Sequence, residues 1–502
     1  MINLQSSSSK AVVILFSRII TALVGIVFVP IYVRTIGVES YGLVAFYGTM
    51  VGALAILDLG LSTAISRQIA ILKEQQNKSK EINDLVFSVE IVYWIIAIVV
   101  GLAIMAMAHP IAVYWVKAKD LPIPVIKKAV MLMGAVFAFQ FPASIYNGVM
   151  IGLEKQIPNA VITIVGTVLK AVGVIFVLIY ISPTVEGYFT WQAIITLLIT
   201  MVLRIFIWQR IAVKGRKAVF SPTQLKTIWR FAAGMTGISL ITFFLTQIDK
   251  IVVSKMVLLE FVGYYNLAFL LSTVIVQVIG PIQPVIFPKL ASLIAQKRQS
   301  EVIGLYHKSC RWVSIIVFPI GFTLILFAKE ILLLWTKNPT LTMHTAPILR
   351  VFAAGTICNC MLWIPYSYLI AKGNTRFTIY QNTIAAVVLM PLLFWWTTKY
   401  GAIGASFVWL SVNAGYVLIS IPVFHQLFLK GELGNWYKKD VALPFLAAGL
   451  LALGAKYFQM QIFPEISIIF LIMLLLFVLL IYVIIIPELR GFVNRFRPRS
   501  FV

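Results

Sequence analysis

The sequence predicts an all-α polytopic membrane protein, and three observations support this fold class. Hydrophobic residues make up 61% of the 502 positions and charged residues only 12%, whereas a soluble domain needs about a quarter of its residues charged to cover its surface. The apolar residues gather in runs that fit spanning helices, which need roughly 20 residues to cross about 30 Å of hydrocarbon. The runs lack the alternation of barrel strands, and lipid offers no partner to unpaired backbone groups.

Breaks at charged clusters and at Gly- and Pro-rich clusters divide the chain into about fourteen predicted spans. The first run is too long for the core of a secretory signal, so we expect it to remain as a span. The predicted spans are 11–33, 42–64, 85–108, 125–150, 158–181, 188–208, 229–250, 263–285, 312–335, 347–370, 378–398, 403–426, 441–458 and 467–486.

The basic residues predict the orientation. If the N-terminus is cytoplasmic, most Lys and Arg residues fall in inner segments, so we expect both termini inside. One patch departs from this pattern and would face outward; it consists of Lys117, Lys119, Lys127 and Lys128.

The second half of the chain repeats features of the first. The segment 37–46 (Gly-Val-Glu-Ser-Tyr-Gly-Leu-Val-Ala-Phe) aligns without gaps with the segment 260–269 (Glu-Phe-Val-Gly-Tyr-Tyr-Asn-Leu-Ala-Phe). Each segment opens the second helix of its half, so we expect two parallel six-helix bundles around a central cavity, followed by two C-terminal helices. The predicted parts are an N-terminal bundle at 1–208, a cytoplasmic linker at 209–228, a C-terminal bundle at 229–426, two further spans at 427–486 and a basic cytoplasmic tail at 487–502.

Charge and composition exclude several classes of function. The net charge of +24 would suggest nucleic acid in a soluble chain. Basic cytoplasmic loops account for it here, so we expect membrane lipids and no nucleic acid as partners. Three cysteines and four histidines show no metal-ligand spacing, and no Gly-rich phosphate loop is present. We therefore expect no metal, no cofactor and no built-in ATPase.

Short motifs in both halves carry a resemblance to a known family. They are Pro30-Ile-Tyr-Val-Arg-Thr-Ile-Gly37, Tyr41-Gly42, Leu57-Asp-Leu-Gly-Leu-Ser62, Gln247-Ile-Asp-Lys-Ile251 and Val262-Gly-Tyr-Tyr265. In their order and helix positions they resemble the Wzx-like polysaccharide flippases of the multidrug/oligosaccharidyl-lipid/polysaccharide exporter superfamily.

The resemblance implies a V-shaped fold of two bundles and a transporter rather than an enzyme. It implies alternating access that moves an undecaprenyl-diphosphate-linked oligosaccharide from the inner to the outer leaflet of the bacterial cytoplasmic membrane. O-antigen, capsule and exopolysaccharide repeat units all fit this description. The lipid-linked oligosaccharide is then the expected substrate, and the machinery that polymerises the polysaccharide is a further expected partner.

Two other functions stay open at this point. A multidrug/cation antiporter of the same superfamily is expected to carry an acidic residue deep in its first helix, and the span 11–33 has Arg18 and no acid. An integral membrane enzyme of polysaccharide assembly is expected to have a larger segment outside the membrane than this chain offers.

Basic residues within spans are candidates for binding the anionic substrate, because an ionisable group in the membrane is costly and often functional. Lys170 lies about 12 residues from either end of its predicted span, or roughly 15–18 Å at 1.5 Å per residue, which is deep for a snorkelling side chain. It faces either a water-filled cavity or a buried ion-pair partner. Arg18 could hold a diphosphate with its planar fork or snorkel to the headgroups. Arg204 lies a turn from its helix end, where an anchoring role competes with substrate binding.

Tyrosines and acids complete the predicted site. Most aromatic residues fit interfacial belts, but sugars stack on aromatic rings, and three tyrosines at similar places in the two halves are candidates for glycan contact: Tyr146, Tyr366 and Tyr368. Three acids are candidates for ion coupling or for structural pairing: Glu90, Asp58 and Asp249. Glu90 is the better candidate for proton coupling, whereas Asp58 and Asp249 favour a structural role.

Overall fold

The computed structural model describes residues 20–462, apart from residues 22, 59, 76–78, 214, 281 and 375. Every regular element in this part of the chain is helical, and ten of its helices are long and apolar enough to cross a membrane. The predicted all-α polytopic class is therefore confirmed, whereas the predicted count of about fourteen spans is not. The predicted span 467–486, the basic tail and the start of the first span lie outside the described residues.

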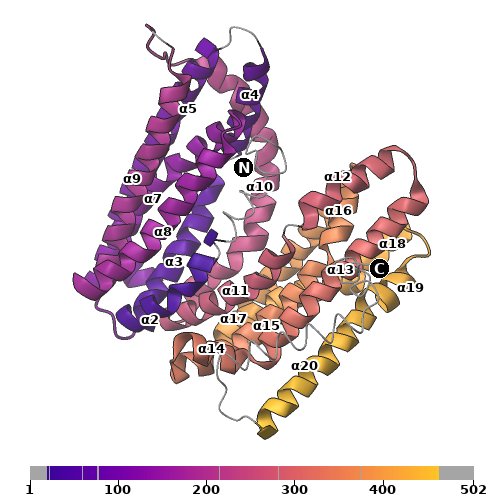
Figure 1. Cartoon of the computed structure of the whole chain (residues 1–502). Coiled ribbons are helices and arrows are strands. Elements are labelled where there is room, and N and C mark those ends of the chain that lie inside the picture. The colour runs from indigo at the N-terminus through magenta and orange to yellow at the C-terminus, as the bar shows by residue number, and fades with distance from the viewer. Residues whose placement is uncertain are drawn as a thin grey trace, which may run out of the picture. The chain divides into compact units, whose positions relative to one another are not determined.

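The chain forms two compact units, residues 1–263 and 264–502. Figure 1 labels the helices in chain order. The first unit contains α2 (Val29–Ile36), α3 (Val38–Leu54), η1 (Ala55–Asp58), α4 (Leu61–Glu74), α5 (Ser79–Ala106), α6 (Ala108–Pro110), η2 (Ile111–Trp115), α7 (Ile123–Gly152), α8 (Gln156–Tyr180), α9 (Val185–Ile211) and α10 (Pro222–Met256). Helix α11 (Leu259–Ile279) begins in the first unit and continues in the second.

The helices of the second unit follow in the same way. They are α12 (Ile282–Ala295), α13 (Gln299–Leu326), α14 (Ala328–Thr336), α15 (Pro339–Met361), α16 (Trp363–Ala371), α17 (Arg376–Gly415), η3 (Tyr416–Ser420), α18 (Ile421–Phe428), α19 (Leu433–Asn435), η4 (Trp436–Ala442) and α20 (Leu443–Ile462). The segments η2, η3 and η4 are π-helical.

Helix α7 is the centre of the first unit, where it packs on α4, α5 and α9, and α8 packs on α9 (Figure 1). Glycines allow the closest approach. A Cβ atom at Gly101 of α5 would lie 2.8 Å from Cβ of Ala138 on α7, and one at Gly134 of α7 would lie 2.8 Å from the carbonyl oxygen of Gly101. In lipid the hydrophobic effect does not drive helices together, so they associate through van der Waals contact. Small residues allow the close approach that this contact requires.

Helix α10 begins at Pro222, capped by the Ser221 hydroxyl, which accepts a hydrogen bond from the Gln224 amide at 3.4 Å. It packs on α3, α4 and α5. The first compact unit therefore includes the helix that matches the predicted span 229–250. The predicted bundle and linker boundaries remain predictions.

Helix α13 is the centre of the second unit and packs on α15 and α20, while α15 packs on α17. A core of large buried side chains joins α13 to α16, α18 and η4. It includes Tyr306, Phe318, Tyr368, Phe424 and Trp436, each no more than 2% exposed.

The predicted spans 378–398 and 403–426 correspond to two helical segments joined at one residue. Gly401 has φ 61° and ψ −141° inside α17, a backbone region that essentially only glycine adopts. The segments then run side by side, since the Tyr416 hydroxyl donates to Asn382 Oδ1 at 3.2 Å. A single glycine thus replaces the predicted loop.

Candidate functional site

A buried ion-pair network in the first unit centres on Glu90 of α5, which is 4% exposed. Arg204 of α9 pairs with Glu90 Oε1 through its Nε atom. The Tyr146 hydroxyl on α7 donates to Glu90 Oε1 at 2.7 Å, and Trp208 Nε1 on α9 donates to Oε2 at 2.8 Å. Trp94 Nε1 donates to the Tyr146 hydroxyl at 3.1 Å. One cation and two neutral donors thus satisfy the carboxylate oxygens and offset the cost of burying them.

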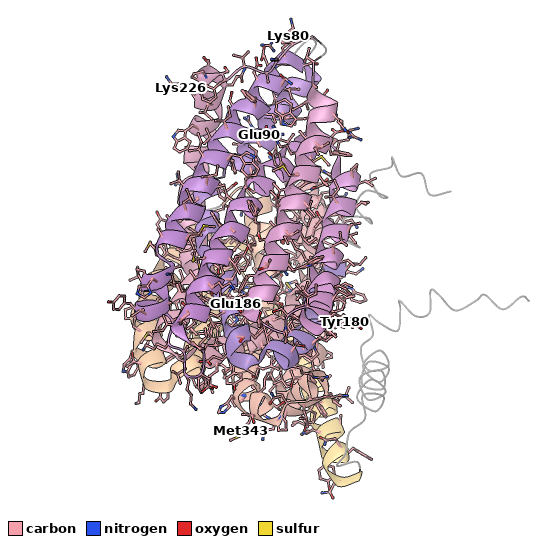
Figure 2. The ribbon with its side chains drawn as sticks, turned by 90° about the vertical axis from the view of Figure 1, so that its left-hand side faces the viewer. Lys80, Glu90, Tyr180, Glu186, Lys226 and Met343 are labelled. Carbon is pink, nitrogen blue, oxygen red and sulfur yellow. The ribbon has the colours of Figure 1, made fainter. Side chains whose placement is uncertain are left out.

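The Glu90 network lies towards one end of the first unit. Figure 2 shows Glu90 nearer the end that carries Lys80 than the end that carries Glu186. The Arg204 side chain is 44% exposed although its Nε atom is engaged. The partly exposed guanidinium has a planar fork, which is the geometry that suits a phosphate.

A second acid, Asp58 at the end of η1, is held by hydroxyl groups. Its Oδ1 accepts from the Tyr93 hydroxyl at 2.6 Å and from Ser144 Oγ at 3.3 Å. Its Oδ2 accepts from Ser62 Oγ at 2.8 Å and from the Ser62 amide at 3.4 Å. The carboxylate thus joins η1, α4, α5 and α7, an arrangement that stabilises helix packing.

Lys170 lies on α8 and is partly buried. Residues spaced by about one helical turn share a face, and Gly166, Val174 and Val177 on the face of Lys170 are all buried. The lysine stem therefore faces neighbouring helices and not lipid. Within the part of the chain that the structure describes, no carboxylate forms an ion pair with Lys170.

Two further charged residues predicted for the site, Arg18 and Asp249, do not belong to the contacts described above. Arg18 lies outside the described residues. Asp249 is a partly buried residue of α10 that interacts with other groups. The predicted roles of both residues remain predictions.

The second unit contains a cavity of about 330 Å³. Its walls carry amide and hydroxyl side chains together with aromatic and aliphatic ones, and the lining includes no Lys, Arg, His, Asp or Glu among the described residues. The lining residues come from α12, the junction of α15 and α16, α17, η3 and α18: Gln283, Asn359, Leu362, Trp363, Pro365, Tyr366, Leu369, Phe377, Thr378, Gln381, Asn382, Tyr416, Ser420, Ile421 and Phe424.

The three tyrosines predicted to contact glycan occupy different environments. Tyr366 lines the cavity and is 42% exposed. Tyr368 is 2% exposed and packs edge-on against Tyr306 and Phe424. Tyr146 is 0% exposed and serves the Glu90 network. In this conformation only Tyr366 of the three presents a ring to a substrate.

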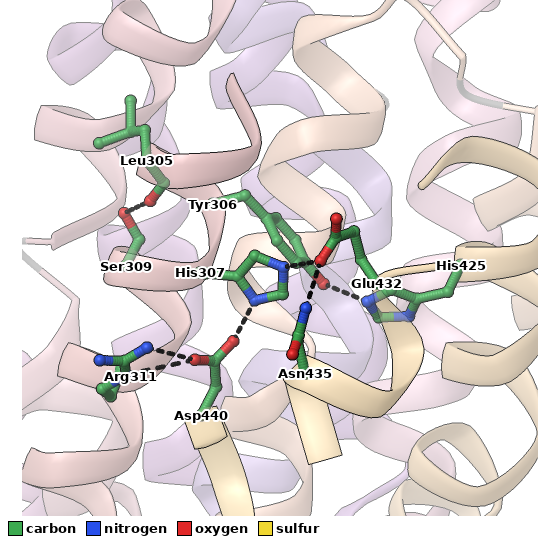
Figure 3. Close-up of polar contacts among 9 residues, drawn as sticks. All are labelled: Leu305, Tyr306, His307, Ser309, Arg311, His425, Glu432, Asn435 and Asp440. Carbon is green, nitrogen blue, oxygen red and sulfur yellow. Dashed lines mark hydrogen bonds and ion pairs between the residues drawn. The ribbon is translucent and has the colours of Figure 1, made fainter. Parts of the chain in front are cut away.

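A polar cluster in the second unit was not predicted from the sequence (Figure 3). His307 of α13 contacts two carboxylates: its Nδ1 faces Asp440 of η4, and its Nε2 lies 3.0 Å from Glu432 Oε2. Both ring nitrogens of His307 therefore lie within hydrogen-bonding reach of a carboxylate oxygen. Arg311 of α13 adds Nε and Nη2 contacts at 3.3 Å to Asp440 Oδ1. Asp440 is 0% exposed.

The cluster extends to the turn before α19. The Asn435 amide donates to Glu432 Oε2 at 2.9 Å. This hydrogen bond, and after it the one from His307, hold the pKa of Glu432 below its ordinary value. The cluster joins α13 to α19 and η4, and no group of His, Cys, Asp and Glu in the described ranges has a metal-binding arrangement.

The chain has apolar helices long enough to span a membrane, and they form two compact units with buried ion pairs and a cavity that carries polar side chains. These features define a polytopic membrane transport protein. Over residues 8–294, more than half of the chain, the sequence matches the family described as polysaccharide biosynthesis protein. The chain belongs to this family, and the predicted resemblance is confirmed.

Curated relatives cover most of the chain. A candidate O-antigen transporter of Shigella flexneri is 22% identical over 79% of this chain and 92% of its own length. The succinoglycan biosynthesis transport protein ExoT of Rhizobium meliloti (strain 1021) is 24% identical over 86% of this chain and 82% of its own length.

Solved structures show the same fold. The lipid II flippase MurJ in an inward closed conformation has a TM-score of 0.69 and 17% sequence identity, over 95% of this chain and 98% of that chain. An inward-facing multidrug resistance transporter of the MATE family has a TM-score of 0.65 and 16% identity, over 86% of this chain and 100% of that chain. Both structures have the fold that the resemblance in the sequence implied.

Proposed function

We propose that the protein is a flippase for a lipid-linked oligosaccharide. It moves an undecaprenyl-diphosphate-linked repeat unit from the inner to the outer leaflet of the bacterial cytoplasmic membrane by alternating access, with both termini in the cytoplasm. The observation that carries this proposal is the family membership, together with relatives named as O-antigen and succinoglycan transporters over 79% and 86% of the chain. The product then reaches the machinery that polymerises the glycan.

The charges of the first unit support an anionic substrate. A diphosphate needs cations while it crosses the membrane, because desolvating an unpaired charge is costly. Lys170 faces the interior of its unit, with no carboxylate partner among the described residues. Arg204 keeps 44% of its side chain exposed while it neutralises Glu90. These two residues would bind the diphosphate, and Arg18 is a third predicted contact.

A multidrug/cation antiporter on the same fold has weaker support. The likeness to MATE transporters shows the fold alone. A cation site needs an acid with spare negative charge, whereas Glu90 is paired with Arg204, and Asp58 is held by three hydroxyl groups and a backbone amide. Neither acid is free to bind a cationic drug in this conformation.

Deletion of the gene in its own bacterium tests the proposed function. The lipid-linked repeat unit should accumulate on the cytoplasmic leaflet while surface glycan disappears, and the wild-type gene should restore both. Surface glycan that persists in the deletion strain, with no accumulation of the lipid-linked precursor, would contradict the flippase function.

A further inference from the structure

The cavity of the second unit has a chemistry different from that of the first unit. Its walls combine side-chain amides and hydroxyls with aromatic rings and four aliphatic or proline side chains, and none of its described lining residues is a Lys, Arg or carboxylate. A diphosphate bound there would lack cations, which excludes the charged part of the proposed substrate. The cavity therefore fits a neutral ligand.

The amides show that this neutral ligand is polar. A side-chain amide presents two N–H donors and a carbonyl acceptor, so it recognises groups that both donate and accept, such as hydroxyls. An acyl chain would leave the Gln381 amide and the N–H donors of Asn382 without partners, which is costly when they are desolvated. Gln381 has no hydrogen-bond partner within the described residues. A polyhydroxylated ligand supplies what an acyl chain cannot.

Neighbouring groups hold the cavity amides in place. Asn359 Nδ2 donates to Asn413 Oδ1 at 2.8 Å, and Asn413 Nδ2 in turn donates to the Trp409 carbonyl at 2.8 Å. The Tyr416 hydroxyl donates to Asn382 Oδ1 at 3.2 Å, which leaves both N–H donors of Asn382 for a ligand. Donors fixed before binding cost less conformational entropy when they engage a ligand.

The backbone around the cavity is irregular where its polar groups enter. Tyr416 and Ser420 are the first and last residues of the π-helical segment η3, and π-helical turns inside helices are frequent at functional sites. Trp363 and Tyr366 follow Leu362, where α15 ends before α16 begins. Their ring faces carry negative partial charge, which attracts the polarised C–H groups of a sugar ring.

The volume limits the ligand. Ligand cavities in proteins range over about 300–1,000 Å³, so 330 Å³ lies at the lower end. The cavity holds a single sugar ring and not a complete repeat unit.

From these observations we infer that the cavity lined by Asn359, Trp363, Tyr366, Gln381, Asn382 and Tyr416 binds one uncharged sugar ring of the lipid-linked oligosaccharide. The inference rests on the proposed function and adds a site that selects the glycan independently of the diphosphate. A substrate would then be held at two chemically different places, its phosphates by cations and one sugar by amides and aromatic rings.

Binding of two probes to the purified full-length protein in nanodiscs tests this site. One probe is the lipid-linked repeat unit extracted from the deletion strain, and the other is sugar-free undecaprenyl diphosphate. The wild-type protein should bind the glycan-bearing lipid more tightly. Asn382→Ala and Gln381→Ala should each reduce that preference by roughly fivefold to tenfold, the effect of one lost hydrogen-bonding group. Affinity for the sugar-free lipid should stay unchanged.

A glutamine outside the cavity provides the matched control. Gln296 is exposed near the end of α12 and donates to Ser292 Oγ at 3.0 Å, so Gln296→Ala should keep the wild-type preference. Tyr366→Ala, at an exposed ring, tests the same site if an amide variant fails to fold.

Each remaining outcome has a defined meaning. An unchanged preference in the folded cavity variants would overturn the sugar site while leaving the flippase intact. Equal weakening of both lipids would also overturn it and assign the cavity to the lipid chain. If the wild-type protein binds neither probe, the proposed function itself fails.

Discussion

Removal of the Arg204 guanidinium should destabilise the first unit through Glu90. Breaking one side of a fully buried ion pair costs about 3–5 kcal/mol, because the other charge stays buried and unpaired. Here Glu90 is 4% exposed but the Arg204 side chain is 44% exposed, so solvent weakens the pair. Tyr146 and Trp208 also keep donating to the carboxylate. We therefore expect Arg204→Met to cost about 2 kcal/mol, below the range for a fully buried pair.

Thermal unfolding of the detergent-purified protein measures this loss. Arg204→Met should unfold at a lower temperature than the wild-type protein, and adding Glu90→Gln should recover much of the difference, because the unpaired charge is then removed. Arg210→Met, on the same helix but outside the pair, should change the midpoint little. An Arg204→Met protein as stable as the wild type, or a double variant less stable than both single variants, would show that Arg204 does not stabilise the unit by neutralising Glu90.

Three further substitutions test the candidate substrate cation, the polar cluster of the second unit and the turn inside α17. Lys170→Ala should abolish glycan export and leave membrane expression unchanged, because it removes a cation without an ion-pair partner in the described chain; unchanged surface glycan would remove Lys170 from the site. Asp440→Asn should destabilise the second unit by about 3 kcal/mol, measured by thermal unfolding, because it removes the buried carboxylate that Arg311 and His307 both contact; no shift would mean that the cluster adds no stability. Gly401→Ala should cost about 1–3 kcal/mol by the same measurement, since alanine is strained at φ 61° and ψ −141°, and a neutral effect would show that the turn relaxes.

The helices were predictable because hydropathy acts locally. The predicted span 125–150 lies within α7 (Ile123–Gly152), and the span 158–181 agrees with α8 (Gln156–Tyr180) within two residues at each end. The bilayer sets the length of an apolar run whatever the rest of the chain does. Predicted span boundaries were wrong where a helix continues through charged residues. Helix α13 (Gln299–Leu326) begins well before residue 312, at which the span was predicted to start.

The candidate site was less predictable because its groups meet across long sequence separations. Glu90 and Arg204 were both singled out as charges within the membrane, but their 114-residue separation gave no sign that they pair. Asp440 lies 133 residues from His307 and was assigned no role. A single sequence states which side chains are costly in lipid, but not which face each helix turns towards its neighbours.

Aromatic residues show the same limit. Tyr366 and Tyr368 are two residues apart on α16, so they lie on different helix faces. One lines the cavity and the other is buried in the core. The sequence predicted glycan contact for both tyrosines, and only the packing of α16 distinguishes them.

Transport by the purified protein shows whether it moves a lipid-linked oligosaccharide between leaflets. The protein is reconstituted into liposomes with the lipid-linked repeat unit labelled by a fluorophore on its glycan, and a membrane-impermeant quencher reports how much label is accessible from outside. We expect label to move between leaflets only in liposomes containing the wild-type protein, and Lys170→Ala to abolish the movement. Leaflet exchange equal to that of protein-free liposomes would contradict the claim that this protein flips a lipid-linked oligosaccharide.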